Sequence, residues 1–478
     1  MRRAVTGLSA LAALTLATVP VAQAAGNDVG VNVVLSTDIT PAILAELSAY
    51  GAVNEQYPEI DALTMRAPAS AVAGIGRLPY VEAVNKDVEV IGKPVASSPF
   101  TSTLEDGLAT WHTDQIDVQD VATQAREVAE TGAGVYVAVL DTGLHSSWPA
   151  YFGEERIAEE LGVAIGGGGG ERGSISYQPN KWSVDQNGHG THVTSTILGY
   201  NMNGTAIAGV APEATVIPVK VLNQNGSGWS SVVAAGIDYV TDLKESGVLG
   251  DAPVVINMSL GGPTNDALST AAIDRAVEAG VLIVASAGNS GEAGMGYPGA
   301  YEPVISVAAN GWTGEWQAPV DTSWWTGVDV AEGAVAETAY IAEFSSRELA
   351  GQDLDVAAPG SWIVGPYQLN AKQSYYFLGG TSMASPHVAG AVALMAERNP
   401  ALAQADAERI LEETATALPA GEREVFDPNL GGLRTIAWGV DASGSGVVDV
   451  PAALDAAFTT ATTDTAPEPA RTKGGPRR

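Results

Sequence analysis

Ser382 stands in a stretch of small residues, 379–390, that reads GGTSMASPHVAG. Pro386 follows four positions later, and apolar residues then recur at helical spacing. The pattern predicts a buried helix that starts at Ser382, with Pro386 in its first turn. The start of a helix has positive potential and free N–H groups, which suits a nucleophile whose reaction creates an oxyanion. A serine that only caps the helix is the alternative for this stretch alone.

Two other polar residues stand at the ends of expected elements. Asp141 closes an apolar strand in VYVAVLDTG, where a buried carboxylate needs a partner to offset its desolvation. His189 lies between two glycines in NGHGTHV, where a helix is expected to begin. A turn aspartate is the alternative for Asp141. A metal pair with His192 is the alternative for His189, although the glutamate of the H-E-x-x-H zinc motif is missing.

Together, Asp141, His189 and Ser382 are the residue types that nucleophilic hydrolysis requires. A serine hydroxyl is a poor nucleophile at neutral pH and needs an adjacent base. Histidine has a suitable pKa to take the proton and return it to the leaving group. A buried carboxylate fixes the histidine tautomer and stabilises the imidazolium.

These residues must be positioned by a larger framework, and the pattern from about residue 111 to 454 is α/β. The expected strands cover residues 135–140, 216–221, 254–258, 281–285 and 304–308. The expected helices cover residues 191–198, 230–244, 267–279, 382–398 and 405–414. This alternation predicts a mainly parallel sheet with helices on both faces. Sites in such folds gather at the carboxyl ends of the strands. The run 166–170 is all glycine and is expected to be a flexible loop.

The three motifs VAVLDTG, NGHGTHV and GGTSMASPHVAG closely resemble the signature motifs of the subtilisin-like serine proteases. The resemblance covers about residues 111–454 and implies the subtilisin-like fold. It implies that Asp141 is the orienting acid, His189 the general base and acid, and Ser382 the nucleophile; the order of the three along the chain is the one described for subtilisin. IVASAGNS at 283–290 resembles the family's oxyanion-hole segment, and Asn289 takes the place of its donor.

Other segments resemble the family's substrate cleft. VINMSLGGP at 255–263 resembles the strand and loop beside the primary specificity pocket. The two walls would be Ser259, Leu260, Gly261 and Gly262 on one side and Ala285, Ser286, Ala287 and Gly288 on the other. Small, uncharged walls predict broad specificity with a preference for apolar or aromatic residues before the scissile bond. GSGWS at 226–230 resembles the segment that pairs with the substrate backbone, through Gly228 and Trp229.

The N-terminal part divides into two segments. Residues 1–24 have a basic start, a short apolar stretch and an A-x-A site, which predicts a cleaved secretory signal; an uncleaved membrane anchor is the alternative. Residues 25–95 read as a small α+β unit that resembles the family's inhibitory propeptide, less strongly than the core resembles the peptidase. The peptidase domain is expected over 96–458, and residues 93–110, which span its start, have the Pro- and Ser-rich composition of a linker. Residues 459–478 are expected to be a disordered tail.

Composition narrows the possible partners. The chain has 23 Lys and Arg against 55 Asp and Glu, a net charge of −32, which argues against nucleic acid and anionic membranes. It has no cysteine, which excludes disulfides and cysteine-based sites. No cofactor is expected for the chemistry, but a structural calcium ion is, with ligands unknown. Residues 145–151 and 199–208 lack the acids that many family members supply to a tight calcium site, which puts that site in doubt.

The sequence therefore predicts a secreted, extracellular, monomeric serine endopeptidase that acts on proteins or peptides and is made as a self-processing precursor inhibited by its own propeptide. One rival is an inactive subtilase used as a binding scaffold. Another is a serine esterase, whose G-x-S-x-G elbow is replaced by G-T-S-M-A around Ser382. A segment at 311–344 carries Trp312, Trp316, Trp324 and Trp325, which are expected to pack the segment rather than to extend the cleft.

Overall fold

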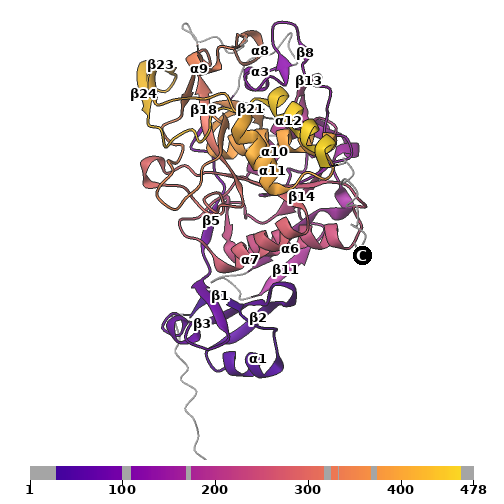
Figure 1. The fold of residues 1–478 in the computed structure, drawn as a ribbon, viewed down its shortest axis with the longest axis vertical. Coiled ribbons are helices and arrows are strands. Elements are labelled where there is room, and N and C mark those ends of the chain that lie inside the picture. Colours follow the sequence, from indigo (N-terminus) through magenta and orange to yellow (C-terminus); the bar gives the residue numbers. More distant parts are fainter. Residues whose placement is uncertain are drawn as a thin grey trace, which may run out of the picture.

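The computed structural model describes residues 28–99, 109–167, 174–316, 324–331, 333–367 and 374–464. The expected signal segment, 1–24, lies outside these ranges. The chain forms a small N-terminal unit and a larger body, and the two are stacked along the long axis of the molecule (Figure 1).

The N-terminal unit is an antiparallel sheet with two short helices, as the α+β prediction required. Its strands lie in the order β2 (Ala52–Tyr57), β3 (Ala62–Pro68), β1 (Asp28–Leu35) and β4 (Val81–Lys86). The helix α1 (Pro41–Leu47) is capped at its start by Thr40, whose side chain accepts a bond from the N–H of Ile43. The helix α2 (Val72–Ile75) is short, because Gly74 and Gly76 weaken helix formation. Strand β2 was not predicted, because its side chains do not alternate clearly between apolar and polar.

The body is built on a nine-stranded sheet, which confirms the predicted mainly parallel α/β fold. Its strands lie in the order β11, β10, β14, β9, β16, β17, β18 and β19, with β20 also paired to β18. Only the pairs β10–β11 and β18–β19 are antiparallel. The bounds are β9 (Tyr136–Asp141), β10 (Val163–Gly167), β11 (Ile175–Gln178), β14 (Thr215–Lys220), β16 (Val254–Met258), β17 (Val281–Ser286), β18 (Ile305–Trp312), β19 (Ala339–Ile341) and β20 (Val356–Pro359).

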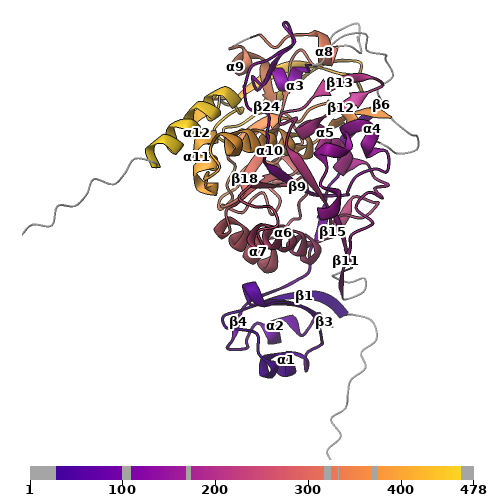
Figure 2. The same cartoon turned by 90° about the vertical axis from the view of Figure 1, so that its right-hand side faces the viewer.

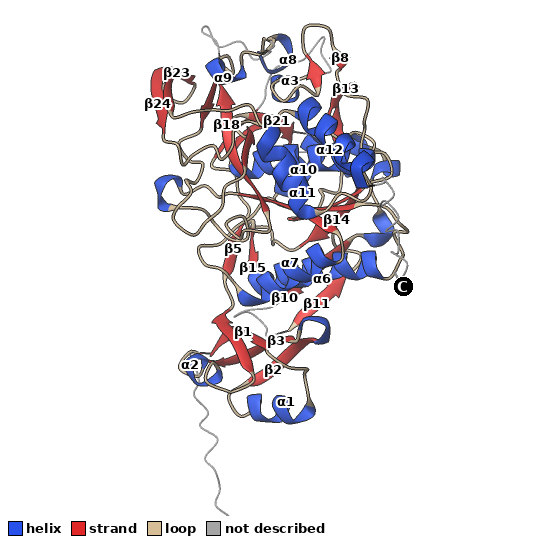
Figure 3. Ribbon diagram, viewed as in Figure 1, coloured by secondary structure: helices blue, strands red, loops and turns tan. Residues whose placement is uncertain are grey.

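Helices cover both faces of this sheet, because its strands are apolar on both sides (Figure 3). In β9, Val137 and Val139 face the core on one side, and Ala138 and Leu140 face the core on the other. The first side carries α5 (His189–Leu198), α10 (Thr381–Arg398), α11 (Gln404–Thr414) and α12 (Val450–Asp464). The second carries α6 (Ser230–Glu245) and α7 (Ala267–Glu278), which lie between the sheet and the N-terminal unit (Figure 2).

Shorter elements complete the body. They are α3 (Trp111–Asp114), α4 (Trp148–Phe152), α8 (Trp324–Gly327), α9 (Val335–Thr338), β5 (Glu89–Ile91), β6 (Ala96–Pro99), β7 (Gln119–Asp120), β8 (Ala125–Arg126), β12 (Gly199–Met202), β13 (Thr205–Ala208), β15 (Ser227–Trp229), β21 (Ile363–Pro366), β22 (Tyr375–Gly379), β23 (Gly421–Asp427) and β24 (Gly432–Trp438).

The structure also bears on the glycine run, the C-terminal tail and the tryptophan-rich segment. Gly166 and Gly167 are paired in the β10–β11 ladder, because the strand continues from the apolar residues before them; 168–170 lie outside the described ranges. Helix α12 continues to Asp464, past the expected start of the tail at 459, since no proline or glycine interrupts it there. Trp312, Trp316 and Trp325 are buried, so packing is their role as predicted; the Trp324 side chain is outside the described part.

Candidate active site

Asp141 and His189 are in direct contact inside the body. Asp141 is the last residue of β9, in the middle of the sheet, and His189 is the first residue of α5. Both carboxylate oxygens of Asp141 lie 2.9 Å from Nδ1 of His189, and both residues are fully buried. The carboxylate can only accept, so Nδ1 carries the hydrogen and Nε2 is left as a base. Nε2 has no partner among the residues that the structure describes.

The glycines beside His189 are required by this geometry. Gly188 has φ +95°, a left-handed conformation that suits glycine. At Gly190, an added Cβ would lie 2.4 Å from the carbonyl oxygen of Gly143 and 3.1 Å from a carboxylate oxygen of Asp141. A side chain at Gly190 would therefore move α5 away from β9, and with it His189 away from its acid, whereas any other residue at Gly188 would strain the backbone just before α5.

Ser382 is the second residue of α10, and its side chain is turned toward Ser259. Its Oγ donates to the carbonyl oxygen of Ser259 at 3.2 Å, and no bond to His189 is formed. If Gly92 carried a Cβ atom, that atom would lie 3.0 Å from this carbonyl oxygen and 3.5 Å from Cε1 of His189. The Ser259 carbonyl and the His189 ring therefore border the same point. The structure thus joins Asp141 to His189 and leaves the bond between His189 and Ser382 unmade. Rotation about the Cα–Cβ bond of Ser382 redirects the hydroxyl.

Pro386 explains a second contact between Ser259 and Ser382. Helix α10 starts at Thr381, so Pro386 lies just beyond the first turn. The prediction that Pro386 lies in the first turn was therefore wrong. Because proline has no N–H, the carbonyl of Ser382 loses its helical donor. Oγ of Ser259 donates to that carbonyl at 2.8 Å and replaces the missing bond.

Asn289 stands beside the N-terminus of α10. Its side-chain oxygen accepts from the N–H of Thr381 at 2.9 Å and from the Thr381 hydroxyl at 3.0 Å. This orientation leaves the Nδ2 group free to point over Gly380. A Cβ atom placed on Gly380 would lie 3.7 Å from Nδ2 of Asn289 and 3.7 Å from the backbone nitrogen of Ser382. Two N–H donors that converge over a glycine can hold an anionic oxygen.

The predicted pocket walls lie at the ends of two neighbouring strands. Ser259 follows β16, Ala285 lies near the end of β17, and the register pairs Met258 with Ala285. Ser259, Leu260, Gly262, Ala285, Ser286 and Ala287 are buried, and Gly261 and Gly288 are half-buried. A loop joins the walls, since the N–H of Gly262 donates to the carbonyl of Tyr297 at 2.8 Å. The walls carry no charged side chain.

Residues 88–96, here called the strap, cross the site from one side to the other. In the strap, β5 pairs antiparallel with β15, which contains Gly228 and Trp229. Ile91 also exchanges two backbone bonds with Gly261, at 3.0 and 3.1 Å. Beyond the site, the N–H of Val95 donates to the carbonyl of Gly379 at 2.7 Å, and β6 then pairs with β22. The first part of the expected linker is therefore paired, because β22 offers free backbone groups to Val95 and β6.

The strap passes directly over the candidate catalytic residues. A Cβ atom placed on Gly92 would lie 3.5 Å from Cε1 of His189. Cα of Pro94 lies 3.7 Å from the Cβ atom that would be placed on Gly380. Lys93, between them, is exposed, and its Cγ lies near Gly226. The sequence motifs gave no signal for Gly379 and β22 as a strap-pairing edge, since such pairing uses only backbone groups.

Two other buried ionisable groups near His189, Asp185 and His192, have structural partners. Asp185 accepts from the N–H groups of Asn187 and Gly188 at 2.8 and 2.9 Å, and burial raises the pKa of its carboxyl. Nε2 of His192 lies 3.0 Å from the carbonyl of Ile363, and burial lowers the pKa of His192 to about 3. Among the described residues, no group able to hold a metal contains His189 or His192.

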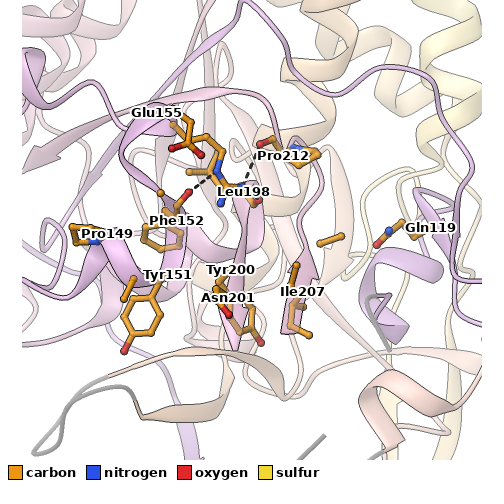
Figure 4. A pocket seen from close by; sticks show the side chains of 15 residues that line it. Gln119, Pro149, Tyr151, Phe152, Glu155, Leu198, Tyr200, Asn201, Ile207 and Pro212 are labelled. Atoms are coloured by element: carbon orange, nitrogen blue, oxygen red, sulfur yellow. Dashed lines mark hydrogen bonds between the residues drawn. The ribbon is translucent and has the colours of Figure 1, made fainter. Parts of the chain in front are cut away.

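A cavity of about 460 Å³ lies elsewhere, against α4 and the β12–β13 hairpin (Figure 4). Its lining contains none of the three candidate catalytic residues. One acid, Glu155, lines it beside Arg156, whose guanidinium donates to the carbonyls of Phe152 and Leu198 at 2.6 and 2.8 Å. The β12–β13 region, which lacks calcium-binding acids, thus lies beside a positively charged side chain of the protein, Arg156. Within the described ranges, no helix is both long and apolar enough to span a membrane.

Comparisons with known proteins agree with this geometry. A family model described as the subtilase family, Peptidase_S8, matches residues 132–432. Subtilisin DY from Bacillus licheniformis is 36% identical over 291 residues, which is 60% of this chain and 85% of that protein. Subtilisin E from Bacillus subtilis (strain 168) is 33% identical over 374 residues, 77% of this chain and 79% of that protein.

Two solved structures share the fold. Fervidolysin from Fervidobacterium pennivorans, a keratinolytic enzyme related to subtilisin, superposes with a TM-score of 0.61 at 23% identity, over 90% of this chain and 61% of its own. Sphericase superposes with a TM-score of 0.53 at 29% identity, over 73% of this chain and 100% of its own.

Proposed function

The chain belongs to the subtilase family and is a serine-type endopeptidase, and from this premise we propose that Asp141, His189 and Ser382 are its catalytic triad. The observation that carries the proposal is the buried contact at 2.9 Å between His189 and Asp141, beside the nucleophile candidate. In this proposal Oγ of Ser382 attacks the peptide carbonyl while Nε2 of His189 takes its proton. The proton then passes to the leaving amine, and water hydrolyses the acyl-enzyme.

Asn289 and the backbone N–H of Ser382 would stabilise the oxyanion. Their convergence over Gly380 supports this role. Subtilisin itself is the reference case, in which loss of one such donor lowers the rate about 10²–10³-fold.

The test of the triad is chemical and kinetic. A fluorophosphonate probe should label Ser382, which an inactive scaffold would not allow. Ser382→Ala and His189→Ala should each remove nearly all peptidase activity, and the double variant should be little worse, because the residues act as a unit. Multiplicative losses would contradict a shared triad. Hydrolysis of simple esters without hydrolysis of peptides would favour the esterase alternative.

The pocket proposal concerns the residue before the scissile bond. The small, uncharged walls formed by 259–262 and 285–288 support broad cleavage with an apolar or aromatic preference there. Gly228 and Trp229 would pair with the substrate backbone, as β15 pairs with the strap. A cleavage profile dominated by Lys or Arg before the scissile bond would contradict the proposal.

The precursor proposal rests on the strap and on the unit before it. We infer that residues 1–24 direct secretion to the extracellular space and that residues 25–95 act as an intramolecular inhibitor that the enzyme removes itself. The pairing of β5 with β15 supports this, because the strap then occupies the substrate path. The active form, from about residue 96, is proposed to be a monomer that acts on protein or peptide substrates.

A structural calcium ion would fit one group of acids, Asp353, Asp355 and Glu408, whose ligand atoms lie within 4.8 Å of one another. Asp355 is fully buried; one oxygen accepts from the N–H of Ser306 at 2.6 Å, and the other is unpartnered within the described part of the chain. Burial raises the pKa of Asp355 to about 8 and that of Glu408 to about 7. A cation would satisfy the free oxygen and offset the repulsion.

A further inference from the structure

A second cavity opens beside the candidate oxyanion hole, on the side of the site that the strap enters after Pro94. It encloses about 510 Å³ and is lined on the catalytic side by Asn289 and Gly379. The β23–β24 hairpin forms the opposite wall, with Asp427, Asn429, Arg434 and Ile436. Phe344 and Trp362 add apolar surface. The hairpin thus brings residues from the C-terminal part of the sequence to the proposed catalytic cleft.

The strap shows which part of a substrate would meet this cavity. Ile91 is paired with Gly261 before the site, and Val95 is bonded to Gly379 after it. The Lys93–Pro94 bond lies between these two pairings, so Val95 is the second residue after it. Val95 also lines the cavity. A substrate on the same path would present its own second residue after the scissile bond here, a step that rests on the proposed function.

The charges of the cavity are unequal. Arg434 contacts Glu343, and its Nε lies 3.0 Å from a carboxylate oxygen of Asp427. Two acids therefore surround one base, and the three together carry a net charge of −1. The Glu343 side chain is 53% exposed and that of Arg434 is 38% exposed, so solvent and ligand can reach both. Arg434 is already paired twice, which leaves little positive potential for an incoming acid.

We propose that Glu343 and the β23–β24 hairpin form a specificity subsite that prefers Lys or Arg over Asp or Glu at the second residue after the scissile bond. The alkyl stem of such a residue would pack on Phe344 and Trp362 while its charged end reaches Glu343. An acidic residue would face two carboxylates and gain no free cation. Arg434 limits the preference, because it neutralises part of the acidic charge.

The test uses the purified active enzyme and fluorogenic peptides that differ only at that second position, as Lys, Met or Asp. Wild type should show a kcat/KM about 5- to 20-fold higher for Lys than for Asp, as partly exposed charges allow. The pair Glu343→Gln with Asp427→Asn should abolish or reverse this ratio. Arg434→Met should increase it. Glu424→Gln, on an exposed position of the same hairpin outside the cavity, should leave it unchanged.

Each measurement is normalised to the fraction of Ser382 that a fluorophosphonate probe labels, so that misfolded protein does not count. High salt should reduce the Lys-to-Asp ratio, because it screens exposed charges. Equal kcat/KM for Lys and Asp, or a ratio that the double acid variant leaves unchanged, would overturn the subsite. Failure of wild type to cleave any of the peptides while Ser382 is labelled would count against the proposed peptidase mechanism instead.

Discussion

Ser259 and Ser382 exchange two hydrogen bonds at the start of α10, and these bonds tie the proposed specificity pocket to the proposed nucleophile. The Ser382 hydroxyl rests on the Ser259 carbonyl, and the Ser259 hydroxyl takes the place of the N–H that Pro386 lacks. The second bond is buried, so the carbonyl of Ser382 has no water to replace a lost donor. The position of the nucleophile therefore depends on a side chain of the pocket wall.

Ser259→Ala should destabilise the protein by about 1–3 kcal/mol, because it leaves a buried carbonyl without a donor. It should also lower kcat more than it raises KM, since the start of α10 becomes less well fixed. Urea unfolding and peptide kinetics measure the two effects. Ser286→Ala is the matched control, because that buried hydroxyl makes only a long contact of 3.5 Å with the carbonyl of Leu260. Equal effects of the two substitutions would show that the bond to Ser382 has no special weight.

The sequence could predict the residues with chemistry but not the contacts that orient them. Asp141, His189, Ser382 and Asn289 lie in motifs whose residue types are those that the proposed reaction requires. The role of Ser259 toward Pro386 needs a contact between residues 123 positions apart, which no local pattern encodes. The rotamer of Ser382 was likewise not predictable, because it depends on which acceptor lies nearest in the fold.

At the scale of the element, the N-terminal unit caps a helix of the body. The first turn of α6 has no side-chain cap of its own. Asp87 supplies one, since its carboxylate accepts from the N–H of Ser231 at 2.9 Å and from the Ser231 hydroxyl at 2.6 Å. The carbonyl of Val88 accepts from the N–H of Ser230 at 2.7 Å. The unit is therefore held by the free donors of a helix start as well as by the strap.

Asp87→Ala should loosen this contact. In the Ser382→Ala precursor, we expect amide hydrogen exchange in the first turn of α6 to rise about 10-fold, as loss of a helix cap implies. Residues 28–86 should keep their internal protection, because the core of the unit is untouched. Asp38→Ala, an exposed position of the same unit, is the control. Unchanged exchange at 230–233 would rule out Asp87 as the cap.

Predictability at this scale followed the hydrophobic pattern. Strands β9, β14, β16 and β17 are apolar on both faces, and their bounds were predicted within a residue or two. The strand β2 and the pairing of β6 with β22 were missed, because their residues are polar or few and their stability comes from partners distant in the chain. Backbone pairing across the site leaves no periodic mark in the sequence.

At the scale of the whole molecule, calcium should matter more as the pH rises. The folded-state pKa of Asp355 is raised to about 8, so without a cation the fold prefers this carboxyl protonated. The unfolded chain then binds fewer protons than the folded one, and stability falls as the pH rises from about 4 to 8. Bound calcium offsets the ionised charges and adds stability by mass action.

The measurement is the thermal midpoint with calcium and with saturating chelator at two pH values. The chelator should lower the midpoint more at pH 9 than at pH 6. Asp355→Asn should shrink this difference, whereas Asp251→Asn, at an exposed position of the body, should not. A midpoint that the chelator leaves unchanged at both pH values would refute the calcium proposal.

The N-terminal unit packs against the helix side of the body that carries α6 and α7. Parallel sheets form slowly because their contacts are distant in sequence, so a folded unit that holds α6 and α7 has a physical purpose as a template. We expect self-cleavage between Val90 and Leu104, leaving an enzyme that begins before Trp111. The Ser382→Ala protein should accumulate uncut. Expression without 26–93 should give poorly folded protein that the segment restores when added separately.

The strap narrows where that first cut falls. The Lys93–Pro94 bond lies between the two paired segments of the strap. Its nitrogen belongs to proline, so a ring carbon occupies the position that a hydrogen has in other residues and crowds the approach to the nitrogen. His189 must deliver a proton to that nitrogen for it to leave, so this bond should resist cleavage while its neighbours in the window are cut after the strap shifts. Pro94→Ala should move the cut to the 93–94 bond and accelerate processing, whereas Val95→Ala should change neither. Intact-mass measurement over time decides the matter: wild type cut at 93–94, or a Ser382→Ala protein cut in the same window with no other protease present, would contradict this account.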